Sequence, residues 1–364
     1  MASAFNTKTI LINLLKVYNQ SGQEKYISTV IMRWLKKHNI DFNVDNVGNI
    51  YSFKHDNAPF LNAHLDSVQR DTDKLAGINL NMDEKLIIKS PGHIIGGDDL
   101  VGVYIILYLL ANTELRFNWI FTVFEETGGI GSTHFLKVNS KLISDSSYGI
   151  VVDRKGNDDI ICANNDYGTE NFQNKLFKIG KDFKYSPATG TWSDANKWRD
   201  YVSCANLSCG YYEAHTTREY VNLADVFNTI NYVKAILSSV KQKFKKAEIK
   251  RFPSWYGGYN EEDFYGHHDD CYYGNDDFYS GYPKMKNQKS HNERLVDEYE
   301  VFEEEDDEFP VTCKFCGVVE NFQDYDNHIW INSLQAFVCE YCLIEIYDEI
   351  ENKIPNNNFY NNCY

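Results

Sequence analysis

The sequence has no run of 18 or more apolar residues, the length from which a membrane-spanning helix is expected. Residues 1–8 also lack the basic region and the apolar stretch of a secretory signal peptide. Four of the nine cysteines form two CxxC pairs, which is more typical of metal binding in a reducing compartment than of a disulfide framework. These features argue against a membrane protein and predict a cytoplasmic one.

Basic residues are scarce in residues 252–309, where four lysines and arginines stand against 17 aspartates and glutamates. This segment accounts for −13 of the net charge of −16. Its acidity argues against binding of nucleic acid. It also has few aliphatic residues and no periodicity, although tyrosine is frequent. We therefore predict an acidic, tyrosine-rich, disordered linker over residues 251–309.

Apolar strands alternate with helical patterns before this linker. Two helices are expected within residues 6–40, joined at Ser21 and Gly22. Such alternation predicts an α/β fold with a mostly parallel mixed sheet and helices on both faces. The further expected strands are 42–44, 49–53, 58–63, 119–124 and 148–152, and the further expected helices are 100–110 and 221–241.

Five potential metal ligands are spread along the first 215 residues, most of them at or just after a predicted strand. An α/β sheet presents its ligand-binding residues beyond such strand ends. Imidazole and carboxylate are the ligands that catalytic zinc accepts. Without a cation, three carboxylates brought together would repel and raise one another's pKa. We therefore predict a dinuclear site. The five residues are His64, Asp98, Glu126, Asp153 and His215.

Two further acids have expected roles in this site. Asp66, two residues after His64, is placed to accept the second N–H of the imidazole and fix its tautomer. Glu125, beside the ligand Glu126, is suited to act as general base toward a metal-activated water. Each motif alone has another explanation: a packed histidine, an Asp-Asp pair in which Asp99 caps a helix, or a glutamate pair on the surface.

The order of these motifs resembles that of the co-catalytic di-zinc exopeptidases, which include peptidase T, leucyl-type aminopeptidases and glutamate carboxypeptidases. The motifs are HxD at 64–66, GxDD at 96–99 before a helix, EExG at 125–128, Val-Asp ending at Asp153, and His-Thr at 215–216. The resemblance covers roughly residues 6–245 and includes the segments 21–24 and 193–196.

This resemblance implies two Zn²⁺ ions (or Co²⁺ or Mn²⁺) and a role for each ligand. Asp98 would bridge the ions. His64 and Asp153 would complete one site, and Glu126 and His215 the other. The peptide bond between Asp98 and the following Asp99 would be cis.

This sequence differs from the two-domain members of the family in the length of one segment. Two-domain relatives insert a domain of about a hundred residues before the final histidine, as the resemblance implies, whereas only 61 residues lie between Asp153 and His215. We therefore expect residues 1–250 to form a catalytic domain without a lid.

The resemblance predicts a metal-dependent exopeptidase that hydrolyses peptide amides. The absence of a lid, the Gly-Asp-Asp motif at 97–99 and the His-Thr-x-x-Glu-Tyr motif at 215–220, which resemble those of peptidase T, favour an aminopeptidase. A carboxypeptidase, an amidohydrolase or deacylase with the same metal site, and a non-catalytic adaptor stay open. Asp194, in the segment 193–196, either faces the substrate or caps a helix that starts near Ala195.

A second module is predicted after the linker. Two CxxC pairs separated by 22 residues have the pattern of a zinc ribbon with one structural Zn²⁺, expected over residues 310–355 before a disordered tail at 356–364. This module or the linker could bind a protein partner. Four unrelated cysteines are the alternative. The predicted ligands are Cys313, Cys316, Cys339 and Cys342.

The remaining cysteines and histidines carry weaker predictions. Cys162, Cys204 and Cys209 are expected to be small buried residues. The segment 267–271, His-His-Asp-Asp-Cys, is expected to be solvated.

Overall fold

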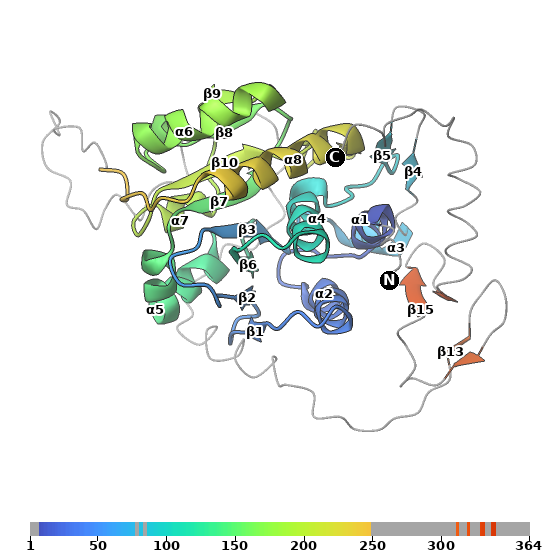
Figure 1. The fold of residues 1–364 in the computed structure, drawn as a ribbon. Coiled ribbons are helices and arrows are strands. Elements are labelled where there is room, and N and C mark those ends of the chain that lie inside the picture. Colours follow the sequence, from blue (N-terminus) through green and yellow to red (C-terminus); the bar gives the residue numbers. More distant parts are fainter. Residues whose placement is uncertain are drawn as a thin grey trace, which may run out of the picture. The chain divides into compact units, whose positions relative to one another are not determined.

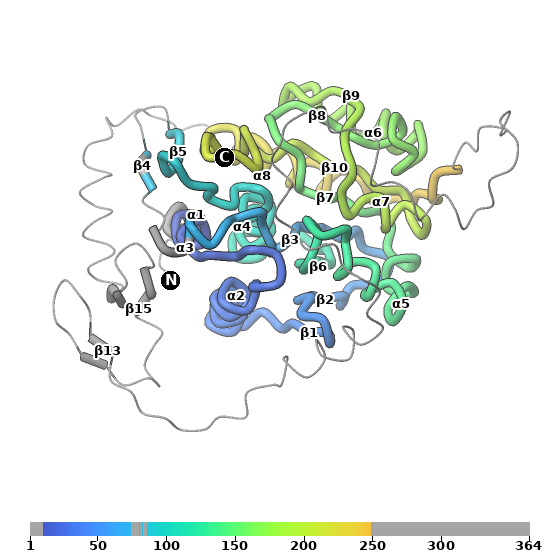
Figure 2. Tube along the Cα trace, turned by 180° about the vertical axis from the view of Figure 1, so that it is seen from behind, coloured from blue at the N-terminus to red at the C-terminus, as the bar shows by residue number. Residues whose placement is uncertain are grey.

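The computed structural model describes residues 7–76, 80–82 and 86–248, together with four short strands after residue 310. Figures 1 and 2 show the chain from two opposite sides. Among the described residues, no helix has both the length and the apolar character needed to cross a membrane.

Eight α-helices and twelve strands precede the predicted linker in the described part of the chain. The helices are α1 (Thr7–Leu15), α2 (Lys25–Lys37), α3 (Asp71–Ala76), α4 (Gly97–Asn112), α5 (Ile130–Asp145), α6 (Glu170–Gly180), α7 (Ala195–Trp198) and α8 (Leu223–Ser239). The strands are β1 (Asn43–Val44), β2 (Ile50–Ser52), β3 (Phe60–His64), β4 (Asn81–Met82), β5 (Ile87–Lys89), β6 (Asn118–Thr122), β7 (Gly149–Arg154), β8 (Asp159–Ile161), β9 (Ser186–Ala188), β10 (Cys204–Ser208), β11 (Tyr211–Tyr212) and β12 (Tyr220–Asn222).

The main sheet has eight strands in the order β1-β2-β6-β3-β7-β10-β8-β9. Its central strands β6, β3, β7 and β10 are all parallel, whereas β2 and β8 join them in antiparallel pairs. A smaller antiparallel sheet has the order β11-β12-β5-β4. The predicted α/β fold with a mostly parallel mixed sheet is confirmed.

Neighbouring side chains along the central strands belong to two different apolar cores, one on each face of the sheet. In β3, Leu61 and Ala63 belong to the larger core with α1, α2, α4 and α8, whereas Phe60 belongs to the core formed with α5 and α7. The same alternation places Trp119 and Phe121 of β6 in the larger core and Ile120 in the other. Because successive side chains point to opposite faces, a strand apolar at every position is covered by helices on both sides (Figures 1 and 2).

The connection from β3 to β6 and the connection from β6 to β7 run in opposite directions across the sheet. The connection through α4 leads to β6 on one side of β3, and the connection through α5 then leads to β7 on the other side. In open α/β sheets, a crevice forms where successive connections diverge in this way, beyond the carboxyl ends of the strands. His64 ends β3 at this point, and Asp153 lies near the end of β7.

Most predicted elements are present, with differences at their ends. The two N-terminal helices are confirmed as α1 and α2. The strand expected over 119–124 ends at Thr122, and Phe124 takes a positive φ of 55°. The helix expected from residue 221 starts at Leu223, because residues 220–222 pair with β5 and the side chain of Asn222 caps the helix by accepting from the Ala224 N–H.

Residues 154–214, between the third carboxylate and the last histidine, contain β8, α6, β9, α7, β10 and β11. Three of these strands, β8, β9 and β10, belong to the main sheet. The absence of a lid domain stays a prediction.

The described strands after residue 310 form two antiparallel hairpins: β13 (Val311–Thr312) with β14 (Val319–Glu320), and β15 (His328–Ile331) with β16 (Ala336–Cys339). Cys339 ends β16. The other predicted zinc ligands of this module, the linker and the tail lie outside the described residues, so these predictions stay open.

Candidate dinuclear metal site

Asp98 lies between the two predicted histidine ligands. Its Oδ1 is 3.1 Å from Nε2 of His64, and its Oδ2 is 3.3 Å from Nε2 of His215. Each carboxylate oxygen thus faces a different imidazole. This is the arrangement expected of a carboxylate that bridges two cations.

The other two predicted ligands lie one on each side of Asp98. Oε1 of Glu126 is 2.9 Å from Nε2 of His215, and Oδ1 of Asp153 is 3.6 Å from Nε2 of His64. Two sets of ligand atoms are close enough to share an ion, namely His64 with Asp98 and Glu126, and His64 with Glu125 and Asp153. The structure therefore brings together all five predicted ligands, and it places Glu125 beside them.

The cluster is acidic and largely buried. Burial, together with the Asp98 carboxylate, raises the pKa of Asp153 to about 7, and burial raises the pKa of Glu125 well above its usual range. Burial would lower the pKa of His215, but its hydrogen bonds to Asp98 and Glu126 raise it to about 11. Carboxyl groups crowded in a poorly solvated place either retain protons or are stabilised in their charged form by nearby cations. Divalent cations coordinated by imidazole and carboxylate fit this donor set.

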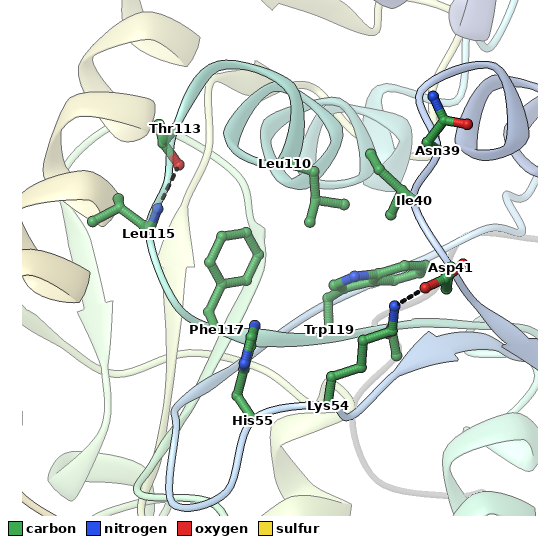
Figure 3. Close-up of a pocket in the computed structure, with 11 residues that line it drawn as sticks. Asn39, Ile40, Asp41, Lys54, His55, Leu110, Thr113, Leu115, Phe117 and Trp119 are labelled. Carbon is green, nitrogen blue, oxygen red and sulfur yellow. Dashed lines mark hydrogen bonds and ion pairs between the residues drawn. The ribbon is translucent and has the colours of Figure 1, made fainter.

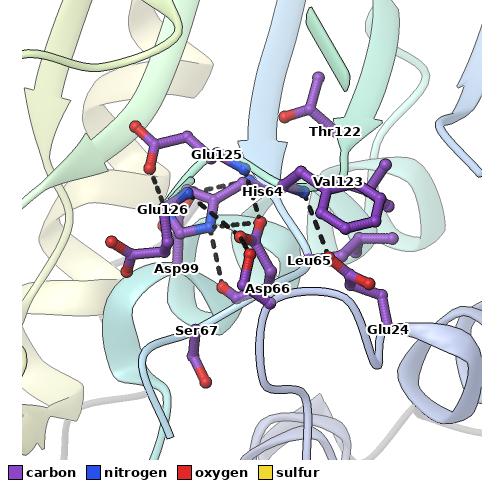
Figure 4. Close-up of polar contacts among 12 residues, drawn as sticks. Glu24, His64, Leu65, Asp66, Ser67, Asp99, Thr122, Val123, Glu125 and Glu126 are labelled. Atoms are coloured by element: carbon purple, nitrogen blue, oxygen red, sulfur yellow. Dashed lines mark hydrogen bonds and ion pairs between the residues drawn. The ribbon is translucent and has the colours of Figure 1, made fainter. Parts of the chain in front are cut away.

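Asp66 supports the site mainly through the backbone (Figure 4). Its Oδ1 accepts from the Glu125 N–H at 2.9 Å, and its Oδ2 accepts from the Glu126 N–H at 3.1 Å and from the Ser21 hydroxyl at 2.7 Å. Nδ1 of His64 lies 2.9 Å from the backbone carbonyl oxygen of Asp66 and 3.5 Å from its carboxylate. The nearer partner of the imidazole is therefore the carbonyl, whereas the carboxylate was expected.

Asp98 and Asp99 have non-helical φ/ψ angles within α4, and Asp99 caps the helical turn that follows this kink and also binds the backbone of β3. Its Oδ1 accepts from the Gly102 N–H three residues later, and its Oδ2 accepts from the His64 N–H, both at 3.1 Å. The peptide bond between Asp98 and Asp99 is cis, as the resemblance implied. Asp99 thus has the capping role that the sequence suggested, and it also fixes the backbone of a predicted ligand.

Glu24 supports the turn that leads into the glutamate pair (Figure 4). It is 1% exposed, and its Oε1 accepts from the N–H groups of Gly22 at 3.0 Å and Phe124 at 3.2 Å. Burial and the charge of Asp66 raise the pKa of Glu24 to about 7. The loop after α1 and the loop after β6 are thereby joined beneath the site.

Asp194 is buried and does not cap α7 with its side chain. Its carboxylate accepts from the hydroxyls of Thr122 at the end of β6 and Ser132 in α5, each at 2.5 Å. Of the two expectations for Asp194, capping is wrong, because its oxygens are used by these hydroxyls. Contact with substrate stays open.

Three residues that the sequence prediction did not single out also hold the ligands. The Tyr211 hydroxyl donates to Oδ1 of Asp153 at 3.2 Å, and Asn206 exchanges hydrogen bonds with the backbone N–H and C=O of the same residue. Glu219, 1% exposed, accepts from three N–H groups in the loop before Asp98. Asn206 could have been noticed in the sequence as a polar residue inside an apolar strand. No feature of the neighbouring sequence indicates that Glu219 is buried.

The expected burial of Cys162, Cys204 and Cys209 is confirmed. The sulfur of Cys209 lies 4.0 Å from Oδ1 of Asp99, beneath the site.

A separate pocket of about 170 Å³ is lined by residues from the end of α4 and the start of β6 (Figure 3). Phe117 and Trp119 are on its wall, and Lys54 pairs with Asp41. Because α4 begins at the candidate site and has 16 residues, this pocket lies at the other end of a helix about 24 Å long. It is distinct from the metal site.

Comparison with known proteins identifies the fold. No family model and no curated protein matches the sequence. Among solved structures, the aminopeptidase PepT from Bacillus cereus ATCC 10987 is 16% identical with a TM-score of 0.51, and the match covers 64% of this chain and 98% of that chain. A tripeptidase from Staphylococcus aureus is 14% identical with a TM-score of 0.53, over 65% of this chain and 98% of that chain.

The TET1 peptidase of Pyrococcus horikoshii is also similar, with 16% identity and a TM-score of 0.51, over 64% of this chain and 99% of that chain. Three peptidases thus have the same arrangement of helices and strands at low sequence identity. The chain has the fold of these peptidases, which is the fold expected from its resemblance to the co-catalytic di-zinc exopeptidases.

Proposed function

We propose that this chain is a metal-dependent exopeptidase, and more specifically an aminopeptidase. The observation that carries the proposal is the position of Asp98, with one oxygen toward His64 and the other toward His215. Glu126 and Asp153 flank this bridge on opposite sides. Such an arrangement supports a site in which Asp98 would be shared by two ions and the other four predicted ligands would be divided between them.

Two bound divalent cations would lower the pKa of a water molecule and polarise the carbonyl group of the substrate. The chain's own contribution to the chemistry centres on Glu125. Its Oε2 lies 3.9 Å from Nε2 of His64, and its side chain is 8% exposed. A general base must be within reach of the attacking water, and the position of Glu125 beside the predicted ligands supports this role.

Glu125 would accept one proton as the water oxygen adds to the carbonyl carbon. It would return that proton to the nitrogen as the amide C–N bond breaks, so that a carboxylic acid and an amine are released. The proton of the acid would then pass to the amine, which gives a carboxylate and an ammonium ion. Asp66 keeps this carboxylate in place by holding the N–H groups of Glu125 and Glu126. Burial of Asp66 and Glu125 limits access of bulk water to the proton being transferred.

The charge around the site supports recognition of the amino end of a peptide. Seven carboxyl groups lie in or near the site, so its environment is acidic and attracts positively charged groups. The basic residues next to the ligands are used elsewhere, since Arg154 pairs with Asp159 and Arg218 pairs with Glu213. This environment favours an α-ammonium group over a terminal carboxylate. The seven are Asp66, Asp98, Asp99, Glu125, Glu126, Asp153 and Asp194.

The direct test is hydrolysis of a defined peptide pool by the full chain loaded with zinc or cobalt, followed by mass spectrometry. We expect stepwise loss of N-terminal residues and protection of peptides whose amino group is acetylated. Glu125→Gln should lower kcat by about 10²- to 10⁴-fold, which is the usual contribution of a general base. Glu114→Gln, an exposed glutamate in the loop after α4, is the matched control.

The other outcomes discriminate among the alternatives. Loss of C-terminal residues would indicate a carboxypeptidase, and cleavage of acetylated amines alone would indicate a deacylase. A protein that binds two metal ions and cleaves none of these substrates would contradict the peptidase and leave an amidohydrolase or deacylase for other amides, or the adaptor.

A further inference from the structure

Glu219 lies four residues after His215, at the point where the chain enters β12. Its side chain is almost fully buried. The sequence between them closes a turn, with the Glu219 N–H donating to the carbonyl of Thr216 at 3.0 Å. Glu219 is thus close in the chain to one predicted ligand without being a ligand itself.

The Glu219 carboxylate holds the loop that carries Asp98. Its Oε2 accepts from the N–H groups of Ile95 at 2.8 Å and Gly96 at 2.9 Å. Its Oε1 accepts from the N–H of Asp98 at 3.1 Å. Three charge-assisted hydrogen bonds from one loop to one carboxylate are a strong and directional restraint.

Gly97, the residue before Asp98, lies close to Glu219 and to the β11–β12 hairpin. A Cβ on Gly97 would lie 3.3 Å from Oε1 of Glu219, 3.2 Å from Cβ of Tyr211 and 3.1 Å from a methyl group of Val221. A side chain at position 97 would require these neighbours to move by a few tenths of an ångström, so glycine fits the close packing of this segment against the β11–β12 hairpin.

Two predicted ligands thus depend on a single buried carboxylate. His215 lies in the same β11–β12 loop as Glu219, and Asp98 is in the segment that Glu219 binds. On the other side of the site, Asp66 binds the N–H groups of Glu125 and Glu126 in the same manner. Oδ2 of Asp98 and Nε2 of His215 face each other at 3.3 Å, so a small shift of the loop would change their separation directly.

We propose that Glu219 is a positioning residue that couples Asp98 to His215 and so sets the affinity of the metal ion that these two residues share. This inference rests on the proposed dinuclear site. It assigns a function to a residue that is not itself a predicted ligand.

The test uses the full chain with Glu219→Gln, and metal affinity is measured by competition with a chromophoric chelator. A glutamine oxygen can still accept from Ile95 and Gly96, but its NH₂ group then faces the N–H of Asp98. We expect affinity for one of the two ions to fall by about 10- to 100-fold, the usual effect of losing a residue that supports a ligand. The visible spectrum of the Co²⁺-loaded protein should change as well.

The matched control is Glu213→Gln, the same substitution in the same hairpin. Glu213 is about half exposed and pairs with Arg218 on the surface, so metal affinity should stay at the wild-type value. Glu219→Asp retains the charge and is expected to recover part of the lost affinity. It also serves as the second variant if Glu219→Gln does not fold, as judged by circular dichroism.

A double-variant cycle separates positioning from general destabilisation. If Glu219 acts through His215, combining Glu219→Gln with His215→Ala should lower metal affinity by clearly less than the product of the two separate effects. In the metal-free protein, hydrogen exchange at the Asp98 amide should be about tenfold faster in Glu219→Gln than in the wild type.

Each contrary result is informative. A wild-type protein that binds two ions, with equal affinities in Glu219→Gln and unchanged amide exchange, would overturn the role of Glu219 alone. Strictly multiplicative effects in the double variant would overturn the coupling. A wild-type protein that binds no metal would overturn both this inference and the proposed function.

Discussion

At the scale of single residues, the site depends on buried carboxylates whose partners are backbone N–H groups. Asp66, Glu24 and Glu219 each accept at least two such N–H groups from loops that carry or support the predicted ligands. If one of these hydrogen bonds is lost, the carboxylate or the N–H group left without a partner is still buried away from water, which destabilises the folded protein. Isosteric amides are therefore informative substitutions at these positions.

Asp66→Asn should reduce both stability and catalysis. One of its oxygens becomes an NH₂ group that faces a donor, either the N–H of Glu125 or the N–H of Glu126. We expect a loss of about 1–3 kcal/mol in the free energy of unfolding and of about 10- to 100-fold in kcat/KM. Denaturant titration and peptide hydrolysis measure the two effects. Asp56→Asn, at an exposed position, is the control, and equal behaviour of the two variants would contradict the prediction.

Glu24→Gln should change how stability depends on pH. Burial and Asp66 raise the pKa of Glu24 from 4.5 to about 7, so the folded protein retains a proton that the unfolded chain releases. The wild type therefore loses stability as pH rises from about 4.5 to about 7, and the loss persists above that.

The variant has no such proton. The difference in unfolding free energy between Glu24→Gln and the wild type should therefore shift in favour of the variant by about 3 kcal/mol over this range. Chemical denaturation at a series of pH values measures it. Glu114→Gln is the control, and a pH-independent difference for Glu24→Gln would refute the assignment.

At the scale of elements, α4 packs closely against the end of β7 at Gly102. A Cβ on Gly102 would lie 2.1 Å from the backbone carbonyl oxygen of Val152 and 2.5 Å from Oδ1 of Asp99. Because Val152 immediately precedes Asp153, this close packing sets how the helix that follows Asp98 sits against the strand that carries Asp153.

Gly102→Ala should destabilise the protein, although alanine is the better helix former by about 1 kcal/mol. The obstacle is backbone, which cannot move aside as a side chain end could, so the helix itself must shift. We expect a net loss of about 1–3 kcal/mol in unfolding free energy and weaker metal binding. Asn112→Ala, at the exposed end of the same helix, should change stability by less than about 0.5 kcal/mol. A Gly102→Ala protein more stable than the wild type would contradict the close contact between α4 and the Val152 carbonyl group.

At the scale of the whole molecule, metal ions should contribute to stability in proportion to their binding. An ion that binds only the folded protein adds about 2.7 kcal/mol at a free concentration of 100 times its dissociation constant. Removal with a chelator should therefore lower the melting temperature of the full chain, and restored zinc or cobalt should raise it again.

Variants that lack ligands of one predicted site should show how much of the metal-dependent stability belongs to each of the two predicted modules. We expect three ions per chain, two in the peptidase fold and one held by the four C-terminal cysteines. Elemental analysis should show one ion fewer in a Cys339→Ser, Cys342→Ser double variant. His215→Ala should instead reduce the metal-dependent shift in melting temperature of the peptidase fold. A wild-type chain with no bound ion after dialysis against zinc would contradict both assignments.

The peptidase fold was predictable because its signals are local. Continuous apolar runs such as Trp119–Thr122 indicate strands covered on both faces, and helical periodicity indicates α1 and α2. Helix α5 was not predicted, although it forms a core with α7. Its residues Ile130–Asp145 have a mixed composition, and only their packing against the sheet shows which positions are buried.

The order and types of the ligand residues were available in the sequence alone, since zinc chemistry restricts them to imidazoles and carboxylates. The tertiary structure decided which atoms meet. It showed that Asp98 faces both histidines, that the carbonyl of Asp66 is the nearer partner of His64, and that Glu219 reaches a loop more than a hundred residues away. Such contacts join segments distant in the chain. No local pattern encodes them, because they exist only after the strands have paired and the loops have closed over their carboxyl ends.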